Sequence, residues 1–445
     1  MPEEYKIITE LFGVEGLGNI DVYRAHGGYT AIEKAFGMSQ DEVIDEVREA
    51  ALAGRGGAWF PAGVKWGFMP KEPREPSYLC VNADESEPGT FKDRHLMEQN
   101  PHQMLEGTII ASYAMRVSVA YVYIRGEMFE ARTIVERAIA EARAAGYIGR
   151  DILGSGYDLE VYVHPGAGAY ICGEEMGLIQ SLNGNRAEPR SKPPFPAQQG
   201  VFEQPTTVNN VQTLSYVPHI VNRGADWFKG IGSERFPGTF IFCVSGHVNR
   251  PGMFELETGS VTMRQIVEDF AGGVRDGREL KAVIPGGAST PPMTPDQIDI
   301  VMDPSNFLAP GGGDFQGMFG TGGIIVMDET TCMVDALLNF MVFFAHESCG
   351  QCTPCREGCP WARDIVSRIE EGQGQPGDLD TLLDVAHNVG PFLCPPSRLT
   401  TICGFGGAFA NPIHGFVHTF RSEFEAHIEE GRCPIHQDKS IRVPG

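Results

Sequence analysis

Ser118-Val-Ala-Tyr-Val-Tyr-Ile124 and Leu159-Glu-Val-Tyr-Val-His164 are two short runs rich in valine and tyrosine, and a helical pattern over 127–145 separates them. Runs dense in β-branched and aromatic residues are typical of strands. Two strands joined by a helix of this length form a right-handed crossover and lie parallel in one sheet. This stretch therefore decides the fold class, because it predicts an α/β protein with a parallel, Rossmann-like sheet.

The pattern extends toward the N-terminus, where 78–82 is expected to be a further strand and 93–115 one long helix. Apolar residues recur at helical spacing over 41–52, and Ser39 is the expected N-cap of that helix. A glycine-rich loop follows. We interpret these early residues as a helical preface to the α/β domain.

The sequence pattern changes near residue 238, where predicted strands follow one another more closely. A small β-grasp module is predicted from strand 239–245, hairpin return 247–256, short helix 261–270 and strand 280–285. Beyond a glycine-dense linker over 311–323, helices are expected at 330–346, 360–371, 378–388 and 412–429. The expected segments are a preface with its glycine-rich loop (1–70), an α/β domain (71–235), the β-grasp module (236–326) and a helical bundle (327–445).

Composition excludes two classes of partner. The 35 Lys+Arg against 58 Asp+Glu leave a net charge of −23, which argues against nucleic acid, because that affinity rests on cations that neutralise phosphates. No run approaches the roughly 18 apolar residues of a membrane span, so we expect no direct insertion into a membrane. The start Met-Pro-Glu-Glu-Tyr-Lys lacks the features of an export signal, which disfavours disulfides for the 11 cysteines and favours metal or redox roles.

Three cysteines form one motif, Cys349-Gly-Gln-Cys352-Thr-Pro-Cys355. Thiolates at this spacing fit an iron–sulfur cluster, while zinc or inert burial are the alternatives. Cys359 completes a ferredoxin-like run, but in two-cluster ferredoxins the fourth cysteine of that run binds the other cluster, and this chain has no second run. A remote fourth ligand is therefore needed, and the candidates are Cys394, Cys403 and Cys433.

Two glycine-rich segments are candidates for ligand binding. The first, 54–57, lets backbone N–H groups approach an anion, although an ordinary loop is the alternative. The second, 163–175, ends a strand and opens a helix, where parallel-sheet proteins place ligands. Its two adjacent carboxylates, Glu174 and Glu175, have helix capping as their alternative role.

Polar residues follow other strands. Asp84, Glu85 and Glu87 lie just beyond 78–82, where acids suit sugar hydroxyls and amide N–H groups, with solvated turn acids as the alternative. The rigid segment 192–195 presents one cation and one ring, and residues 208–213 add amide and hydroxyl groups before another helix.

Six ordered motifs together resemble a known family: GRGGAWFPAGVKW (54–66), NADESEPGTFKDR (82–94), GAGAYICGEE (166–175), KPPFPA (192–197), PTTVNNVQTL (205–214) and ESCGQCTPCREG (347–358). They resemble the flavoprotein subunit of respiratory complex I, which binds NADH and FMN and carries a [4Fe–4S] cluster. The resemblance implies hydride transfer from NADH to FMN and then single-electron transfer to the cluster. No protein nucleophile or general acid is required, so no catalytic residue is expected.

The resemblance also implies residue roles. FMN would be bound by Gly54, Arg55, Gly56, Gly57, Lys65, Asn82, Asp84, Glu85, Tyr170, Gly173, Glu174, Val208, Asn209, Asn210 and Thr213. NADH would be bound by Phe60, Phe68, Glu87, Glu175, Lys192 and Phe195. The cluster would be held by Cys349, Cys352, Cys355 and Cys403, with Cys394 as the alternative to Cys403 because its spacing is nearer that usual in the family.

Three further expectations follow from the resemblance. The partners would be the thioredoxin-like [2Fe–2S] subunit and the large iron–sulfur subunit, with the complex peripheral on the cytoplasmic side of a bacterial inner membrane. A diaphorase subunit of an NAD-linked hydrogenase or formate dehydrogenase, and a zinc-stabilised nucleotide-binding scaffold without redox turnover, are the alternatives. Trp59 stands where the family commonly has glycine, so its indole must point away from the nucleotide pocket or narrow it.

Overall fold

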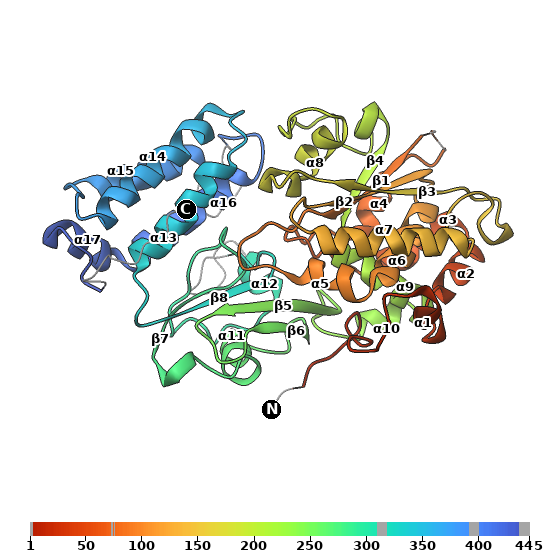
Figure 1. Ribbon diagram of the computed structural model, residues 1–445, viewed down its shortest axis with the longest axis horizontal. Coiled ribbons are helices and arrows are strands. Elements are labelled where there is room, and N and C mark those ends of the chain that lie inside the picture. The colour runs from red at the N-terminus through yellow and green to blue at the C-terminus, as the bar shows by residue number, and fades with distance from the viewer. Residues whose placement is uncertain (1–2, 73, 75, 309–317, 391–399, 436–445) are drawn as a thin grey trace.

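The computed structural model describes residues 3–72, 74, 76–308, 318–390 and 400–435 (Figure 1). Three bodies pack together in it: a parallel sheet with its helices, a second sheet, and a helical bundle drawn in blue. None of the helices in these described ranges combines the length and apolar character that a membrane span requires.

The first sheet has the strand order β3-β2-β1-β4, and every neighbouring pair is parallel. Its strands are β1 (Tyr78–Ala83), β2 (Val119–Ile124), β3 (Glu160–Pro165) and β4 (Thr206–Asn210). The predicted strands at 78–82, 118–124 and 159–164 are confirmed. Strand β4 was not expected, because its sequence Thr-Thr-Val-Asn-Asn carries a single aliphatic residue.

Helices surround this sheet and form the preface. They are α1 (Ile20–Ala25), α2 (Thr30–Phe36), α3 (Gln40–Glu49), α4 (Ala62–Trp66), α5 (Lys92–Gln99), α6 (Pro101–Ala114), α7 (Phe129–Ala144), α8 (Glu175–Leu182), α9 (Val211–Arg223) and α10 (Ala225–Lys229), with 3₁₀ turns Ile152–Gly154, Tyr170–Gly173 and Val201–Glu203. Ser39 caps α3 in a capping box, as predicted. The single helix expected over 93–115 is wrong: it divides at Asn100, because Pro101 begins a new helix.

The second sheet is mixed, with the order β6-β5-β8-β7. Its strands are β5 (Thr239–Gly246), β6 (Gly252–Glu257), β7 (Leu280–Ile284) and β8 (Gly323–Asp328), accompanied by α11 (Met263–Gln265), the π-turn Ile266–Phe270, the 3₁₀ turn Arg275–Gly277 and α12 (Pro304–Leu308). The antiparallel β5–β6 hairpin is confirmed, and β8 inserts parallel to β5. The sequence pattern did not separate β8 from the glycine-dense linker before it. The division of the chain into four segments stays a prediction.

The bundle contains α13 (Met333–Glu347), α14 (Thr353–Glu370), α15 (Asp378–Val389), α16 (Phe405–Thr419) and α17 (Arg421–Glu430). Helix α14 starts seven residues before the expected position 360. Pro354 lies in its first turn, where proline is tolerated, so Cys355 and Cys359 are both helical. The expected helix 412–429 is two helices that meet at Phe420.

Candidate functional site

Two adjoining cavities lie at the carboxyl ends of the parallel strands. The larger has a volume of about 500 Å³ and the smaller about 250 Å³. Five residues line both cavities: Gly56, Asn82, Gly173, Glu174 and Asn210. They come from the glycine-rich loop, the ends of β1 and β4, and the turn before α8, so the two cavities share a wall built by the sheet.

The larger cavity has an aromatic rim. Phe60, Phe68 and Phe195 line it with their rings about half exposed, at 47%, 59% and 54%. The ring centroids of Phe60 and Phe68 are 6.1 Å apart. Exposed rings on a cavity wall are suited to stack a flat heterocycle, in line with the NADH-binding role that the family resemblance implies for these three residues.

Opposite charges meet in the same cavity. The Glu175 carboxylate lies 3.0 Å from the Lys65 ammonium and also contacts Lys192. Burial raises the pKa of Glu175, but Lys65 and Lys192 outweigh it, and the net pKa lies below the ordinary value. A negative and two positive groups therefore share one wall of the cavity.

Glu174 behaves differently from its neighbour. Its carboxylate accepts the backbone N–H groups of Met176 and Gly177 at 2.8 and 2.9 Å, which makes it the N-cap of α8. The helix-capping alternative is thus correct for Glu174. The residue nevertheless lines both cavities.

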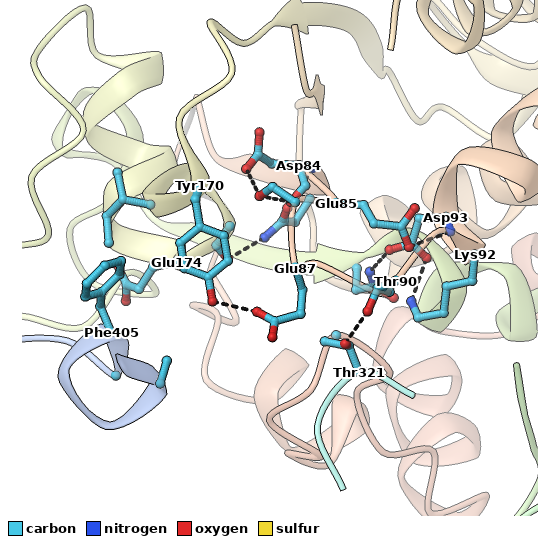
Figure 2. Close-up of a pocket in the computed structure, with 18 residues that line it drawn as sticks. Asp84, Glu85, Glu87, Thr90, Lys92, Asp93, Tyr170, Glu174, Thr321 and Phe405 are labelled. Atoms are coloured by element: carbon cyan, nitrogen blue, oxygen red, sulfur yellow. Dashed lines mark hydrogen bonds and ion pairs between the residues drawn. The ribbon is translucent and has the colours of Figure 1, made fainter. Parts of the chain in front are cut away.

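The smaller cavity is acidic (Figure 2). The Tyr170 hydroxyl donates to Glu87 over 2.7 Å, and the Ser289 amide and hydroxyl also donate to Glu87. The Glu85 carboxylate accepts the N–H groups of Asp93 and Arg94 at the start of α5. These acids lie in a formed network, so the solvated-turn alternative is wrong for them.

Asp84 is the acid whose position fits a bound ligand. It is only 5% exposed, and its Oδ1 has no hydrogen-bond partner among the described residues, while Oδ2 accepts the Ser86 hydroxyl. A buried carboxylate oxygen without a donor is costly. An N–H or O–H group of FMN in the smaller cavity, which Asp84 lines, would satisfy it, so the residues present fit this cofactor.

The raised pKa of Asp84 predicts that the free energy of unfolding depends on pH. Burial raises that pKa from 3.8 to about 7. The folded protein holds the proton of Asp84 more tightly than the unfolded chain does. The resulting stabilisation is therefore fully present below pH 3.8, and it is lost as the pH rises through about 7. We expect the stability of Asp84→Asn relative to the wild type to rise by roughly 2–3 kcal/mol between pH 5 and pH 8, because only the wild type loses this stabilisation. Urea unfolding of FMN-free protein at both pH values checks this, and a gap independent of pH would contradict it.

Two predicted FMN residues do not line either cavity. The Arg55 side chain is fully buried and donates to the Pro237 carbonyl, while its backbone N–H donates to Thr213. Gly57 adopts a φ of +103°, and an added Cβ would meet Thr321 at 3.2 Å. Both residues shape the loop without bordering the cavities, and all the other predicted FMN and NADH residues line at least one of the two.

Trp59 points away from the nucleotide cavity. Its ring packs against Phe236, Phe240 and Phe319 of the β-grasp core, and its Nε1 donates to the Gly320 carbonyl at 3.3 Å. Its φ of +54° lies in the left-handed region that favours glycine. The indole therefore leaves the pocket open, and the burial of this large ring offsets the cost of the backbone conformation.

A third cavity is lined by four cysteines, Cys349, Cys352, Cys355 and Cys403. The Ile402 N–H donates to the Cys352 sulfur over 3.4 Å, as backbone amides do to cluster sulfurs. Four thiols around one cavity fit the donor set of a [4Fe–4S] cluster. The alternative ligand, Cys394, lies outside the described residues.

The structure adds site residues that the motifs did not indicate. Ile171 and Phe405 line both the acidic cavity and the cysteine cavity, so one wall separates the two. Thr321 enters the acidic cavity from the segment before β8 and shares a hydrogen bond with Thr90 (Figure 2). Phe405 and Thr321 come from other bodies of the fold, and no local pattern connects them to the flavin motifs.

Known proteins match this arrangement. Residues 47–219 match the family model of the Nuo51 FMN-binding domain, 241–315 that of the SLBB domain, and 335–427 that of the NADH-ubiquinone oxidoreductase-F iron-sulfur binding region. An F subunit of NADH-quinone oxidoreductase from Rhizobium meliloti (strain 1021), numbered 2 in that organism, is 49% identical over 94% of this chain and 99% of its own length. The chain belongs to the family of NADH-quinone oxidoreductase F subunits.

Other relatives agree with this assignment. The NADH-quinone oxidoreductase F subunit of Streptomyces coelicolor is 47% identical over 95% of this chain and 90% of its own length. A crystal structure of an NAD⁺-reducing [NiFe]-hydrogenase in the air-oxidized state contains a chain with a TM-score of 0.78 and 31% identity, matched over 96% of this chain and 67% of that chain. The predicted fold class, the flavoprotein family, and the FMN and [4Fe–4S] cofactors are thereby confirmed.

Proposed function

We propose that this member of the F-subunit family oxidises NADH and passes the electrons singly to partner subunits of an NADH:quinone oxidoreductase. One observation carries the proposal: Ile171 and Phe405 are common to the acidic cavity and the cysteine cavity. The nucleotide cavity, the flavin residues and the cluster ligands thus adjoin in the order that electrons would follow. When bound, FMN takes up two electrons from NADH and gives them up one at a time.

The shared wall is the proposed flavin site. FMN would be held by Gly54, Gly56, Lys65, Asn82, Asp84, Glu85, Tyr170, Gly173, Glu174, Val208, Asn209, Asn210 and Thr213, with Arg55 and Gly57 supporting the loop. Asn210 caps α9 through its side chain, and Asn210, Thr213 and Lys65 all line the larger cavity, so the start of this helix borders the place proposed for the FMN phosphate. The acids near Asp84 would accept hydrogen bonds from hydroxyl and N–H groups.

The larger cavity is the proposed entry for NADH. Phe60, Phe68 and Phe195 would stack the adenine, and Glu175 and Lys192 would hold ribose and amide groups. Glu87, which lines the acidic cavity, would likewise hold a ribose or amide group of the substrate. These groups position NADH and exclude water, and no side chain is asked to transfer a proton.

Partners and location belong to the same proposal. We infer that the chain docks on a thioredoxin-like [2Fe–2S] subunit and a large iron–sulfur subunit, and that the complex lies peripherally on the cytoplasmic side of the membrane. The alternative is a diaphorase subunit, which the match to an NAD⁺-reducing hydrogenase chain supports. Mass spectrometry of the subunits that copurify with the chain separates the two, since a hydrogenase large subunit would contradict our proposal.

Phe195→Ala tests the nucleotide site. The ring is 54% exposed on the cavity wall, so its removal should spare the fold, while the lost stacking should raise the KM for NADH about 10- to 100-fold with little change in kcat. NADH oxidation with ferricyanide as acceptor gives both constants. Phe129→Ala is the matched control, because Phe129 is 66% exposed and lines neither of the two cavities. Equal KM values in the two variants would refute the assignment.

A further inference from the structure

A second group of metal-ligating side chains lies in the bundle, away from the cluster ligands. Cys332, His427 and Cys433 are all buried, at 1%, 0% and 1% exposure, and their ligand atoms lie within 4.8 Å of one another. Cys332 precedes α13 and Cys349 follows it. Because α13 has 15 residues, its two ends are roughly 22 Å apart, so this group is separate from the [4Fe–4S] ligands.

The imidazole of His427 is oriented for a ligand. Its Nδ1 lies 2.7 Å from the backbone carbonyl of Glu423, which can only accept a hydrogen bond, so Nδ1 carries the proton. Nε2 therefore presents its lone pair, and it faces the Cys332 sulfur at 3.3 Å. When one ring nitrogen of a histidine binds a metal, the other usually donates a hydrogen bond, often to a backbone carbonyl, which fixes the orientation of the ring.

The Cys332 sulfur is also placed as an acceptor. It receives the backbone N–H of Asp335 at 3.4 Å, at the N-terminus of α13. Because Nδ1 holds the ring proton, the Cys332 thiol is the donor to Nε2 in the metal-free protein. A cation that displaced this thiol proton would lie between the sulfur, the imidazole nitrogen and Cys433.

We propose that Cys332, His427 and Cys433 bind a structural zinc ion that fixes the C-terminal helix to the bundle. Two thiolates and an imidazole form a donor set that Zn²⁺ prefers. At usual Zn–S and Zn–N lengths, a tetrahedral site separates sulfur and nitrogen by about 3.6 Å, close to the 3.3 Å found. Burial of all three ligands keeps substrates out, which indicates a structural role.

The zinc would complete a two-point attachment of α17. At the start of this helix, Glu423 accepts the Met333 N–H at 2.7 Å and pairs with Lys281 of β7 at 2.7 Å. At its other end, His427 and Cys433 reach the N-cap of α13. The metal would hold α17 across the junction of the bundle and the β-grasp sheet, independently of FMN and of the cluster.

Metal analysis of the full-length protein, purified with its flavin and iron, tests the site. We expect about one zinc and about four iron atoms per chain. X-ray absorption at the zinc edge should show two sulfur neighbours near 2.3 Å and nitrogen or oxygen neighbours near 2.0–2.1 Å, as is typical of such sites. Cys433→Ser should lower zinc at least 10-fold, keep the iron, and speed amide hydrogen exchange in α17. Cys243→Ser, at an equally buried cysteine in β5, should keep both metals.

Several results would overturn the proposal. The first is a wild-type protein that contains almost no zinc after expression with added zinc and incubation with ZnCl₂. This test uses no variant, so it does not depend on whether a variant folds. Others are zinc that Cys433→Ser and Cys332→Ser retain in full, iron in place of zinc at the absorption edge, or a Cys332–Cys433 disulfide in protein alkylated at lysis.

Discussion

Replacing Cys403 with serine should remove most of the iron, lowering it from about four atoms per chain to under about one. Cys403 is the only ligand candidate of the four-cysteine cavity that lies outside the 349–355 motif, so its loss leaves three thiolates for a four-iron cluster. Iron analysis and EPR of the dithionite-reduced protein measure the outcome. FMN should stay bound, because Cys403 does not line the flavin cavities.

Cys359→Ala is the control for this prediction. Cys359 is buried in α14 with its sulfur 3.8 Å from that of Cys355, and it would be the ligand if the ferredoxin-like run applied. We expect Cys359→Ala and Cys394→Ser to keep the iron and the EPR signal. If Cys403→Ser kept its iron while either of these variants lost it, the ligand assignment would be wrong.

Gly173→Leu should abolish FMN binding, with the flavin content falling from about one per chain to below about 0.1. Gly173 lines both cavities, and an added Cβ would meet only Asp84, at ordinary contact distances of 3.5 and 3.9 Å. The larger side chain would therefore occupy the cavity without displacing the protein around it. Flavin released by acid and measured by fluorescence reports the content.

The matched control is Gly407→Leu in α16. An added Cβ there meets nothing within 4 Å, and the residue lines none of the three cavities described above. It should keep its flavin and iron. Both variants should also keep the melting temperature of FMN-free wild type. Normal flavin content in Gly173→Leu would place the cofactor outside the shared wall.

The parallel sheet could be predicted because its buried strands are dense in valine and tyrosine and alternate with helices. Strands β4 and β8 escaped prediction for different reasons. The first, Thr-Thr-Val-Asn-Asn, is polar because its end supplies Asn209 and Asn210 to the site. The second continues directly from a glycine-dense stretch, and only its pairing with β5 and β7 defines it.

The candidate site followed from the same logic, since residues after parallel strands converge at one sheet edge. The different surroundings of neighbouring residues could not be predicted. Glu174 caps a helix while Glu175 pairs with two lysines, although the two are adjacent in sequence. Trp59 turns into the β-grasp core because Phe236, Phe240 and Phe319 form a site for its ring, and those residues come from another body of the fold.

Anaerobic titration of the purified protein with NADH tests whether NADH, FMN and the [4Fe–4S] cluster occupy adjoining sites in this chain. Flavin absorbance and low-temperature EPR are followed together after each addition. We expect NADH to bleach a flavin present at about one per chain and, in the same preparation, to produce the signal of a reduced [4Fe–4S] cluster. Neither change should occur in Gly173→Leu. A protein whose cluster is reduced by dithionite but stays oxidised with excess NADH, or one without flavin and iron absorbance, would contradict this expectation.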